Sequence, residues 1–447
     1  MAGLMCDAVK KGRIIMFVTS SLGSNEKGHL TVGGVDAAEL VKEYGTPLYV
    51  MDERTIRGHC RTFQKSIEDN YGGNGLTVYA SKAFNCKEMC RIIKDEGLGI
   101  DVVSGGELYT ALSVDFPPER IVFHGNNKTE EEIKTALEAG VGRIVVDNLF
   151  ELRTIEQMAE KLGKNAGVMI RIKPGIDAHT HNFIRTGQID SKFGFALETG
   201  EAFSAVKEVL EQKNVTLKGI HCHIGSQIFE IEPFKAAAEV MLGFMAKVKE
   251  ELCYEIKELN LGGGFGIRYL IDDDAKLYKT FMEQVSITVK ETCKRLGLNI
   301  PFIMIEPGRA IVGPAGTTLY TVGAVKTIPG IRNYVSVDGG MTDNPRYILY
   351  QSEYSIAVAN KIDKPADYIA TIAGRCCESG DLIQEDAKIQ TPEAGDILAV
   401  FCTGAYNYSM ASNYNRVPRP AVVMIKDGKP RLIIKRESYE DMVKNDI

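Results

Sequence analysis

From Leu48 onward, short apolar runs alternate with amphipathic stretches over roughly 250 residues, the length of a closed (β/α)₈ barrel. The apolar runs span 48–51, 76–79, 100–103, 121–123, 143–146, 167–172, 217–223, 258–261 and 301–305. The clearest amphipathic stretches span 130–139, 150–161, 200–212 and 233–252. Alternation of strands and helices on this scale predicts a parallel sheet, and the number of units predicts an α/β fold built on a (β/α)₈ TIM barrel.

After Arg309 the alternation stops, and short β segments punctuated by Gly and Pro take over. They span 317–326, 334–338, 368–373, 396–401, 421–426 and 431–435. This pattern predicts a C-terminal all-β domain, which an N-terminal strand joins. We therefore predict an N-terminal segment at 1–47 that belongs to the β domain, a barrel at 48–309 and the β domain at 310–447.

Composition limits the function classes. A chain of 447 residues with a net charge of −6 lacks the basic surplus of a nucleic-acid binder. It contains no apolar run long enough to span a bilayer. Its ten cysteines are irregularly spaced, unlike a disulfide framework. These features predict a cytoplasmic protein that binds neither nucleic acid nor membrane.

Polar residues follow the predicted barrel strands where each strand ends. The main ones are Lys82, Ser104, His124, His223, Gly262 and Glu306. In barrel enzymes the carboxyl ends of the strands form one mouth, where the active site lies. The sequence therefore predicts that these residues converge on a single site.

Several of these residues have two readings when taken alone. Gly262-Gly263-Gly264 is either a phosphate cradle of backbone N–H groups or a bare tight turn. Lys82, at the end of an apolar strand, is either an imine-forming amine or a solvated surface lysine. Glu306, after a buried strand, needs a cationic partner, for which Arg309 and a protonated pyridine nitrogen are candidates.

The remaining candidates are also ambiguous. His223 could be a ligand, a base or a stacking partner, and no third ligand accompanies it and His221, so we predict no metal. Arg346 lies in a turn-rich loop that suits carboxylate capture, or is simply solvated. Cys377-Glu378 places a thiol beside a carboxylate on a Gly-bounded turn, which is often incidental.

Seven motifs in order resemble the diaminopimelate decarboxylase family, in the alanine-racemase-like class of pyridoxal phosphate enzymes. The resemblance runs from about Gly28 to Lys435. The motifs are Tyr79-Ala80-Ser81-Lys82-Ala83, His223-Ile224-Gly225-Ser226-Gln227, Gly262-Gly263-Gly264-Phe265-Gly266, Glu306-Pro307-Gly308-Arg309, Met341-Thr342-Asp343-Asn344-Pro345-Arg346, Cys377-Glu378-Ser379-Gly380-Asp381 and Gly404-Ala405-Tyr406.

The resemblance implies a pyridoxal 5'-phosphate cofactor and a homodimer with shared active sites. Lys82 would hold the cofactor as an imine, and Cys377 would be the proton donor. The implied cofactor-binding residues are Lys82, His223, Ser226, Gly263, Gly264, Glu306, Pro307, Gly308, Arg309 and Tyr406. The implied substrate-binding residues are Arg309, Arg346, Tyr350, Glu378 and Tyr406. The implied reaction converts meso-2,6-diaminopimelate to L-lysine and CO₂, the last step of lysine biosynthesis.

Alternatives remain on sequence grounds. A related decarboxylase of a basic D-amino acid, such as D-ornithine or D-lysine, or of a carboxylated polyamine would keep the cofactor residues. A racemase would have arginine in place of Glu306, and a non-catalytic carrier would lack the β domain. Tyr347 and Cys376 depart from the family pattern beside substrate-facing positions. Residues 180–195 are a candidate lid.

Overall fold

The computed structural model describes residues 8–10, 13–15, 17–176 and 190–447. The chain divides into two compact units. One contains Met1–Gly58, Ile267–Asp274 and Arg309–Ile447, and is called the β unit below. The other contains His59–Gly266 and Ala275–Gly308, and is called the barrel unit. Most of the candidate lid lies outside the described residues.

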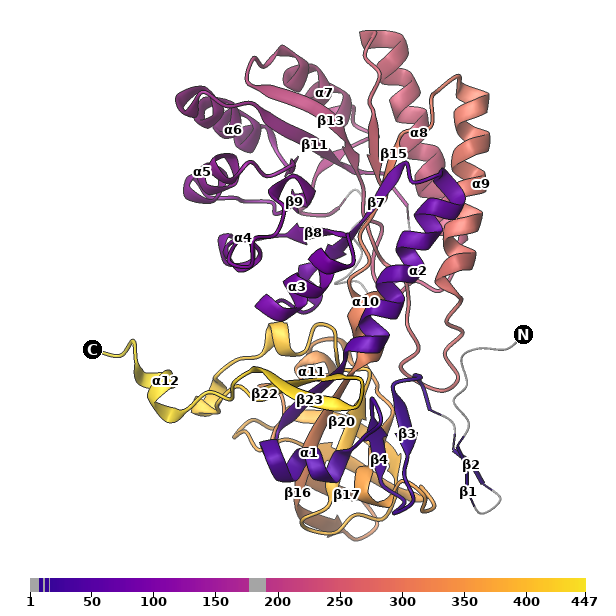
Figure 1. The fold of residues 1–447 in the computed structure, drawn as a ribbon, viewed down its shortest axis with the longest axis vertical. Coiled ribbons are helices and arrows are strands. Elements are labelled where there is room, and N and C mark those ends of the chain that lie inside the picture. Colours follow the sequence, from indigo (N-terminus) through magenta and orange to yellow (C-terminus); the bar gives the residue numbers. More distant parts are fainter. Residues whose placement is uncertain (1–7, 11–12, 16, 177–189) are drawn as a thin grey trace. The chain divides into compact units, whose positions relative to one another are not determined.

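Eight of the described strands pair in parallel around a closed ring in the barrel unit (Figure 1). In ring order they are β7 (Gly75–Ala80), β8 (Gly99–Val102), β9 (Ile121–Phe123), β10 (Arg143–Val146), β11 (Ala166–Lys173), β13 (Val215–His221), β14 (Glu258–Asn260) and β15 (Phe302–Ile305). The pairing of β15 with β7 closes the ring, and β12 (Phe195–Ala196) pairs in parallel with the end of β11. The predicted α/β barrel is confirmed.

Helices follow the barrel strands and lie outside the ring (Figure 1). They are α3 (Lys87–Asp95), α4 (Gly105–Leu112), α5 (Glu130–Ala139), α6 (Leu149–Leu162), α7 (Glu201–Glu211), α8 (Glu232–Leu252) and α9 (Tyr278–Leu296), while α2 (Glu53–Tyr71) precedes β7. Local sequence sets their ends: Thr129 and Glu132 form a capping box before α5, and Gly140 ends it in the left-handed region.

The interior of the barrel is apolar. Val78, Val122, Val145, Met169 and Met304 form one buried cluster, contributed by five different strands. Side chains from successive strands therefore fill the ring as a packed core. This packing leaves the strand ends as the place where polar groups gather.

The β unit is mainly sheet. Its long sheet has the order β20-β19-β17-β16-β6-β22-β23, with β21 paired to β16 and β18. These strands are β16 (Gly316–Ile328), β17 (Arg332–Val337), β18 (Ile356–Val358), β19 (Tyr368–Ala373), β20 (Leu382–Ile389), β21 (Ile397–Phe401), β22 (Ala421–Lys426) and β23 (Lys429–Ile434). Of three short helices in this part of the chain, α10 (Arg309–Val312) precedes β16, α11 (Arg346–Tyr350) lies between β17 and β18, and α12 (Tyr439–Val443) follows β23. The predicted C-terminal β domain is confirmed.

The apolar run that begins at Leu48 is not a barrel strand, which corrects its assignment to the barrel rhythm. It forms β6 (Leu48–Asp52), which pairs antiparallel with β16 and parallel with β22 in the β unit. All five residues of β6 are buried. A strand that is buried on both faces has the same apolar sequence in a barrel and in the β unit, because burial on both faces removes the alternation of apolar and polar residues that would distinguish the two.

The N-terminal region contributes small elements to the β unit. Strands β1 (Ala8–Lys10) and β2 (Arg13–Ile15) form a two-stranded antiparallel sheet, and β3 (Leu22–Ser24), β4 (Leu30–Val32) and β5 (Val35–Asp36) form a three-stranded sheet. Helix α1 (Ala37–Tyr44) follows, capped by Asp36. Across the described part of the chain, no helix is long and apolar enough to cross a membrane.

Candidate active site

The barrel strands carry the predicted polar residues to one rim. Lys82 lies in a 3₁₀ turn (Ser81–Ala83) directly after β7, His124 follows β9, and His223 lies two residues beyond β13. The glycine loop follows β14, and Glu306 follows β15. Because the strands are parallel, all of these positions lie at the carboxyl end of the barrel. The predicted convergence at the strand ends is therefore present in the barrel unit.

Glu306 is buried, with 7% of its surface exposed. Its Oε1 accepts hydrogen bonds from His124 Nε2 and Asn260 Nδ2, each at 2.7 Å. Its Oε2 accepts one from His221 Nε2 at 3.2 Å. Burial alone would raise the pKa of Glu306, but the charges and hydrogen bonds of His124 and His221 hold it well below its usual range.

The glycine loop is shaped for close approach of another backbone. A Cβ on Gly263 would lie 2.2 Å from the Glu306 carbonyl oxygen, and one on Gly264 would lie 2.7 Å from the Gly225 carbonyl oxygen. Gly262 and Gly264 also have φ values of +69° and +117°, which other residues rarely adopt. The loop, called the cradle below, therefore packs directly against the neighbouring backbone and has no room for a side chain at Gly263 or Gly264.

His223 is held against this cradle. Its Nδ1 accepts a hydrogen bond from the Gly263 backbone N–H at 3.3 Å. Burial lowers the pKa of His223 well below its ordinary value, and the positive charges of Lys82 and Arg171 lower it further. The ring is therefore neutral near pH 7. A neutral, flat imidazole suits a stacking role better than that of a charged partner.

Lys82 faces the acidic side of the rim. Its side chain is exposed on the barrel unit. Asp101, at the end of β8, is buried, with 2% of its surface exposed. Burial raises the pKa of Asp101, and the positive charge of Lys82 is among the groups that lower it. Lys82 thus lies close enough to the buried Asp101 carboxyl group to interact with it electrostatically.

A second group of predicted residues lies together in the β unit. The Arg309 guanidinium donates from Nη1 to the Tyr269 hydroxyl at 2.5 Å and lies 4.8 Å from the centre of the Tyr406 ring. The Arg346 guanidinium lies 5.2 Å from the Tyr350 ring centre and 5.8 Å from that of Tyr406. Tyr406 itself has a φ of +62°, a strained value for a tyrosine. Two guanidinium groups therefore share one aromatic wall.

Arg346 is a buried cation without a carboxylate counterion among the residues the structure describes. Only 8% of its surface is exposed, its Nη2 donates to Ser352 Oγ at 3.2 Å, and its Nε has no hydrogen-bond partner there. Buried charges are normally paired. The position is therefore suited to an anion supplied from outside the chain.

Comparisons with known proteins identify the family of this chain. The family model described as "Pyridoxal-dependent decarboxylase, pyridoxal binding domain" matches residues 53–313. Diaminopimelate decarboxylase of Bacillus subtilis is 50% identical over 97% of this chain and 98% of its own length, and that of Halalkalibacterium halodurans is 48% identical over the same shares. The chain belongs to the diaminopimelate decarboxylase family.

A solved member of the family has the same architecture. The crystal structure of diaminopimelate decarboxylase from M. jannaschii in complex with L-lysine matches with a TM-score of 0.88 and 36% identity. The match covers 96% of this chain and 98% of that one. Both the barrel and the β unit are thus family features. The chain is a pyridoxal-dependent amino-acid decarboxylase.

The barrel rim fits the cofactor of this family. Pyridoxal phosphate needs an amine for its aldehyde, backbone donors for its phosphate and a carboxylate for its ring nitrogen. The rim has Lys82, the cradle at Gly263 and Gly264, and the buried Glu306 carboxylate. The donor set therefore matches the group that the family model implies.

The loop that carries Cys377 and Glu378 is organised by one buried carboxylate. Asp381, 3% exposed, accepts hydrogen bonds from the backbone N–H groups of Met341 at 2.6 Å and Cys376 at 2.7 Å. The Cys377 N–H donates to Asn415 Oδ1 at 2.8 Å. The backbone is thus held while the side chains of Cys377 and Glu378 remain exposed on the single chain.

The two departures from the family pattern have different surroundings. The Tyr347 hydroxyl donates to Glu385 Oε2 at 2.9 Å, and Glu385 Oε1 accepts from Arg332 at 2.5 Å. Tyr347 therefore fastens α11, the helix on which Arg346 lies, to β20. Burial and the negative charge of Asp381 raise the pKa of Cys376 to about 11, so its thiol stays protonated near neutral pH.

Three residues at these sites were not assigned roles from sequence. Asn260 and His124 contact Glu306, and Tyr269 contacts Arg309. His124 stood out as a polar residue at a strand end, but Asn260 lies inside a strand and Tyr269 in an unremarkable loop. His221 does have further potential ligands beside it that the sequence does not reveal, because His124, His221 and Glu306 place their ligand atoms within 4.8 Å of one another.

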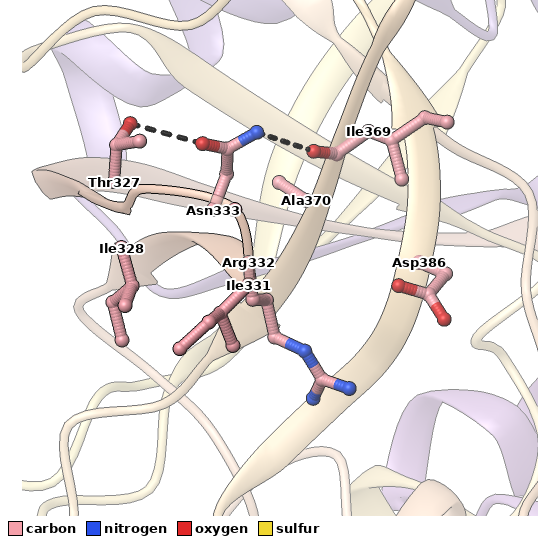
Figure 2. Close-up of a pocket in the computed structure, with 9 residues that line it drawn as sticks. Thr327, Ile328, Ile331, Arg332, Asn333, Ile369, Ala370 and Asp386 are labelled. Atoms are coloured by element: carbon pink, nitrogen blue, oxygen red, sulfur yellow. Dashed lines mark hydrogen bonds between the residues drawn. The ribbon is translucent and has the colours of Figure 1, made fainter.

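The β unit also contains a separate hollow of about 290 Å³ beside the turn between β16 and β17. Figure 2 shows Arg332, Asn333, Ile369 and Asp386 along its walls. The Asn333 amide accepts a hydrogen bond from the Thr327 hydroxyl and donates one to the Ile369 carbonyl oxygen, as the dashed lines show. Arg332 forms an ion pair with Glu385. None of the predicted site residues lines this hollow.

Proposed function

We propose that this chain decarboxylates meso-2,6-diaminopimelate at its D-configured carbon, releasing CO₂ and L-lysine. The observation that carries the choice of substrate is the buried Arg346, which lacks a carboxylate partner in the described structure and shares the Tyr406 wall with Arg309. A substrate with a second, distal carboxylate supplies the missing anion. Lysine and ornithine have no such group, so this arrangement favours the diamino diacid.

In the proposed reaction, pyridoxal phosphate supplies the electron-withdrawing ring that accepts the electron pair left when the Cα–carboxylate bond breaks. Lys82 would hold the cofactor, with the phosphate on the backbone of Ser226, Gly263 and Gly264. His223 would lie flat on the ring as a neutral imidazole. Glu306 would keep the ring nitrogen protonated by pairing with it as a carboxylate.

The β-unit residues would bind the substrate and complete the proton balance. Arg309 and Arg346 would hold the distal carboxylate, with Tyr350 and Tyr406 as walls. Glu378 would bind the distal ammonium group. Cys377 would donate a proton from Sγ to Cα after CO₂ has left, which requires a protonated thiol.

We further propose that the enzyme is a cytoplasmic homodimer in which Cys377 and Glu378 serve the partner's site. Their exposure on a rigidly held loop supports this proposal. Mixing Lys82→Ala with Cys377→Ala protein should then restore about a quarter of wild-type activity, because half of randomly mixed dimers contain one intact site of two. If the mixture of these two variants stays inactive after subunit exchange has been confirmed, the shared site is contradicted.

The substrate assignment is tested with Arg346→Met. Loss of a buried charge-assisted contact predicts a fall of about 100-fold or more in kcat/KM for meso-diaminopimelate. The cofactor absorbance should be unchanged, because Arg346 is assigned to the substrate alone. An Arg346→Met enzyme with wild-type kcat/KM, or a wild-type enzyme that prefers D-lysine or D-ornithine, would overturn the diaminopimelate assignment in favour of a basic D-amino acid.

A further inference from the structure

The carboxylate of Glu306 is surrounded by three buried hydrogen-bond donors from three different strand ends. His124 follows β9, His221 ends β13 and Asn260 ends β14. All three are buried, with 4%, 1% and 0% of their surfaces exposed. We call this set the donor cage. Its members lie 46 to 182 residues from Glu306 in the chain, so the barrel fold alone brings them together.

The orientation of each donor is determined by its surroundings. The Asn260 Oδ1 accepts the Gly262 backbone N–H at 2.9 Å, so the Nδ2 amide group must face Glu306. An ionised carboxylate only accepts, so both histidines carry their proton on Nε2. Within the described structure, His221 Nδ1 has no hydrogen-bond partner, which fits a neutral ring. Burial lowers the pKa of His221 to about 4, although the charge of Glu306 opposes the shift.

The cage leaves room for only one further donor. A carboxylate has roughly four acceptor positions, two on each oxygen. His124 and Asn260 occupy both positions on Oε1, and His221 occupies one on Oε2. The remaining acceptor position is on Oε2. This is the atom available to a cofactor ring nitrogen.

The three donors also affect the position of a proton shared between the Glu306 carboxylate and a pyridine nitrogen. In a buried pair of carboxylate and pyridine, the charged form with the proton on nitrogen competes with the neutral form with the proton on the carboxyl group. Hydrogen bonds to a carboxylate stabilise its ionised form and lower its proton affinity. Each N–H in the cage therefore favours the proton on nitrogen.

We propose that His124, His221 and Asn260 are positioning residues that keep the proton between Glu306 Oε2 and the cofactor ring nitrogen on the nitrogen. This inference rests on the proposed function and deepens it, because a protonated ring is the stronger electron acceptor. None of the three touches the reacting carbon in this scheme. They act through Glu306.

Other charged groups near Glu306 act in both directions. The negative charge of Glu306 helps raise the pKa of buried Asp101, while Lys82 and Arg171 are cationic groups in the same electrostatic neighbourhood. Arg171 lies 3.9 Å from Asp147, so part of its charge is already balanced. The cage is the component in direct hydrogen-bond contact with Glu306.

The test is the ¹⁵N resonance of the ring nitrogen in holoenzyme loaded with ¹⁵N-labelled pyridoxal 5'-phosphate. In the wild type the shift should be that of a protonated pyridine. In His124→Leu and Asn260→Leu it should move towards the unprotonated value. His124→Gln, which keeps an N–H donor, should restore the protonated shift. The control is Asn165→Leu: Asn165 lies just before β11, and its Oδ1 accepts a hydrogen bond from the Thr216 hydroxyl, so this variant should not move the shift.

The outcomes separate the inference from the function on which it rests. If the wild type binds the cofactor and both leucine variants keep the protonated shift, the cage has no influence on the proton and the inference is wrong. If Asn165→Leu moves the shift equally, the effect is structural and the inference is also wrong. If the wild type does not bind the cofactor at Lys82, the proposed function fails together with it. A tightly bound metal ion at His124, His221 and Glu306 would overturn the cage as well.

Discussion

A buried ion pair beside the barrel mouth offers a sharp test of the energetic reasoning. Lys128 Nζ lies 2.7 Å from Glu151 Oε1, and the two side chains are 1% and 2% exposed. The same Nζ donates to the carbonyl oxygens of Gly125 and Val145, each at 2.8 Å. Lys128 therefore fastens the loop that follows His124 to the neighbouring strand β10.

Removing either partner leaves the other charge buried and unpaired. Lys128→Met and Glu151→Leu should each lower the free energy of unfolding by about 3–5 kcal/mol. The double variant removes both charges and leaves two carbonyl groups without a donor, each costing about 1–3 kcal/mol. The double variant should therefore cost about 2–6 kcal/mol, close to the cost of either single variant rather than their sum, and the cycle should give a coupling of about 3 kcal/mol or more.

The Lys128→Met variant should also be pH-dependent. Burial raises the pKa of Glu151 to about 7 even beside Lys128, and loss of the lysine raises it further. The unpaired carboxyl group is then neutral at low pH and charged at high pH, so its folded-state penalty grows as pH rises. The variant should be destabilised less at pH 6 than at pH 8.5.

Urea unfolding of the four proteins measures this cycle. The matched control is the exposed pair Lys65 and Asp69 on α2, at 2.9 Å with 74% and 40% of the side chains exposed. The same cycle there should give a coupling of about 0.3–0.5 kcal/mol. Additive single effects at Lys128 and Glu151, or a coupling as small as that of the control, would refute the reasoning.

Two further predictions concern the cradle and the N-terminal region. Gly263→Ala should abolish cofactor binding, because its Cβ would lie 2.2 Å from a backbone oxygen. The control Gly243→Ala in α8, whose Cβ would meet no atom within 4 Å, should bind the cofactor normally and gain about 0.5–1 kcal/mol of stability. Absorbance titration with the cofactor distinguishes the two variants. Asp36→Ala should cost about 1 kcal/mol through loss of the α1 cap. Burial raises the pKa of Asp36, but hydrogen bonds from the Ala38 N–H, Asn25 and His29 outweigh burial, so the pKa is lowered overall. The stability that the Asp36 cap contributes is therefore present above the unfolded pKa and is lost as pH falls below about 4. An Asp36→Ala difference in unfolding free energy that persists unchanged at pH 3 would contradict this reasoning.

Much of the fold could be predicted because the barrel repeats a simple pattern. Strand β9 and helix α5 have the bounds that the apolar and amphipathic patterns predict. The errors come from strands that carry no such signal. The run at Leu48 is buried on both faces, and β20 (Leu382–Ile389) mixes Gln, Glu, Asp and Lys with apolar residues, so it was not recognised as a strand.

The site could be predicted only in part, for a physical reason. Lys82, His223 and Glu306 each stand next to a strand end, where an isolated polar residue is conspicuous. The partners of Glu306 depend on which strands become neighbours in space, and Asn260 has no local pattern that marks it. Its importance comes from the pairing of β14 with β15, which places its amide 2.7 Å from Glu306 Oε1.

The most direct measurement of the central claim is release of CO₂ and formation of L-lysine from meso-diaminopimelate by the holoenzyme. Lys82→Ala is the test variant, and Lys134→Ala on the exposed face of α5 is the matched control. We predict stoichiometric CO₂ and L-lysine from the wild type and the control, and no release above background from Lys82→Ala. Undiminished release from Lys82→Ala, or no L-lysine from a wild-type protein with its cofactor bound, would contradict it.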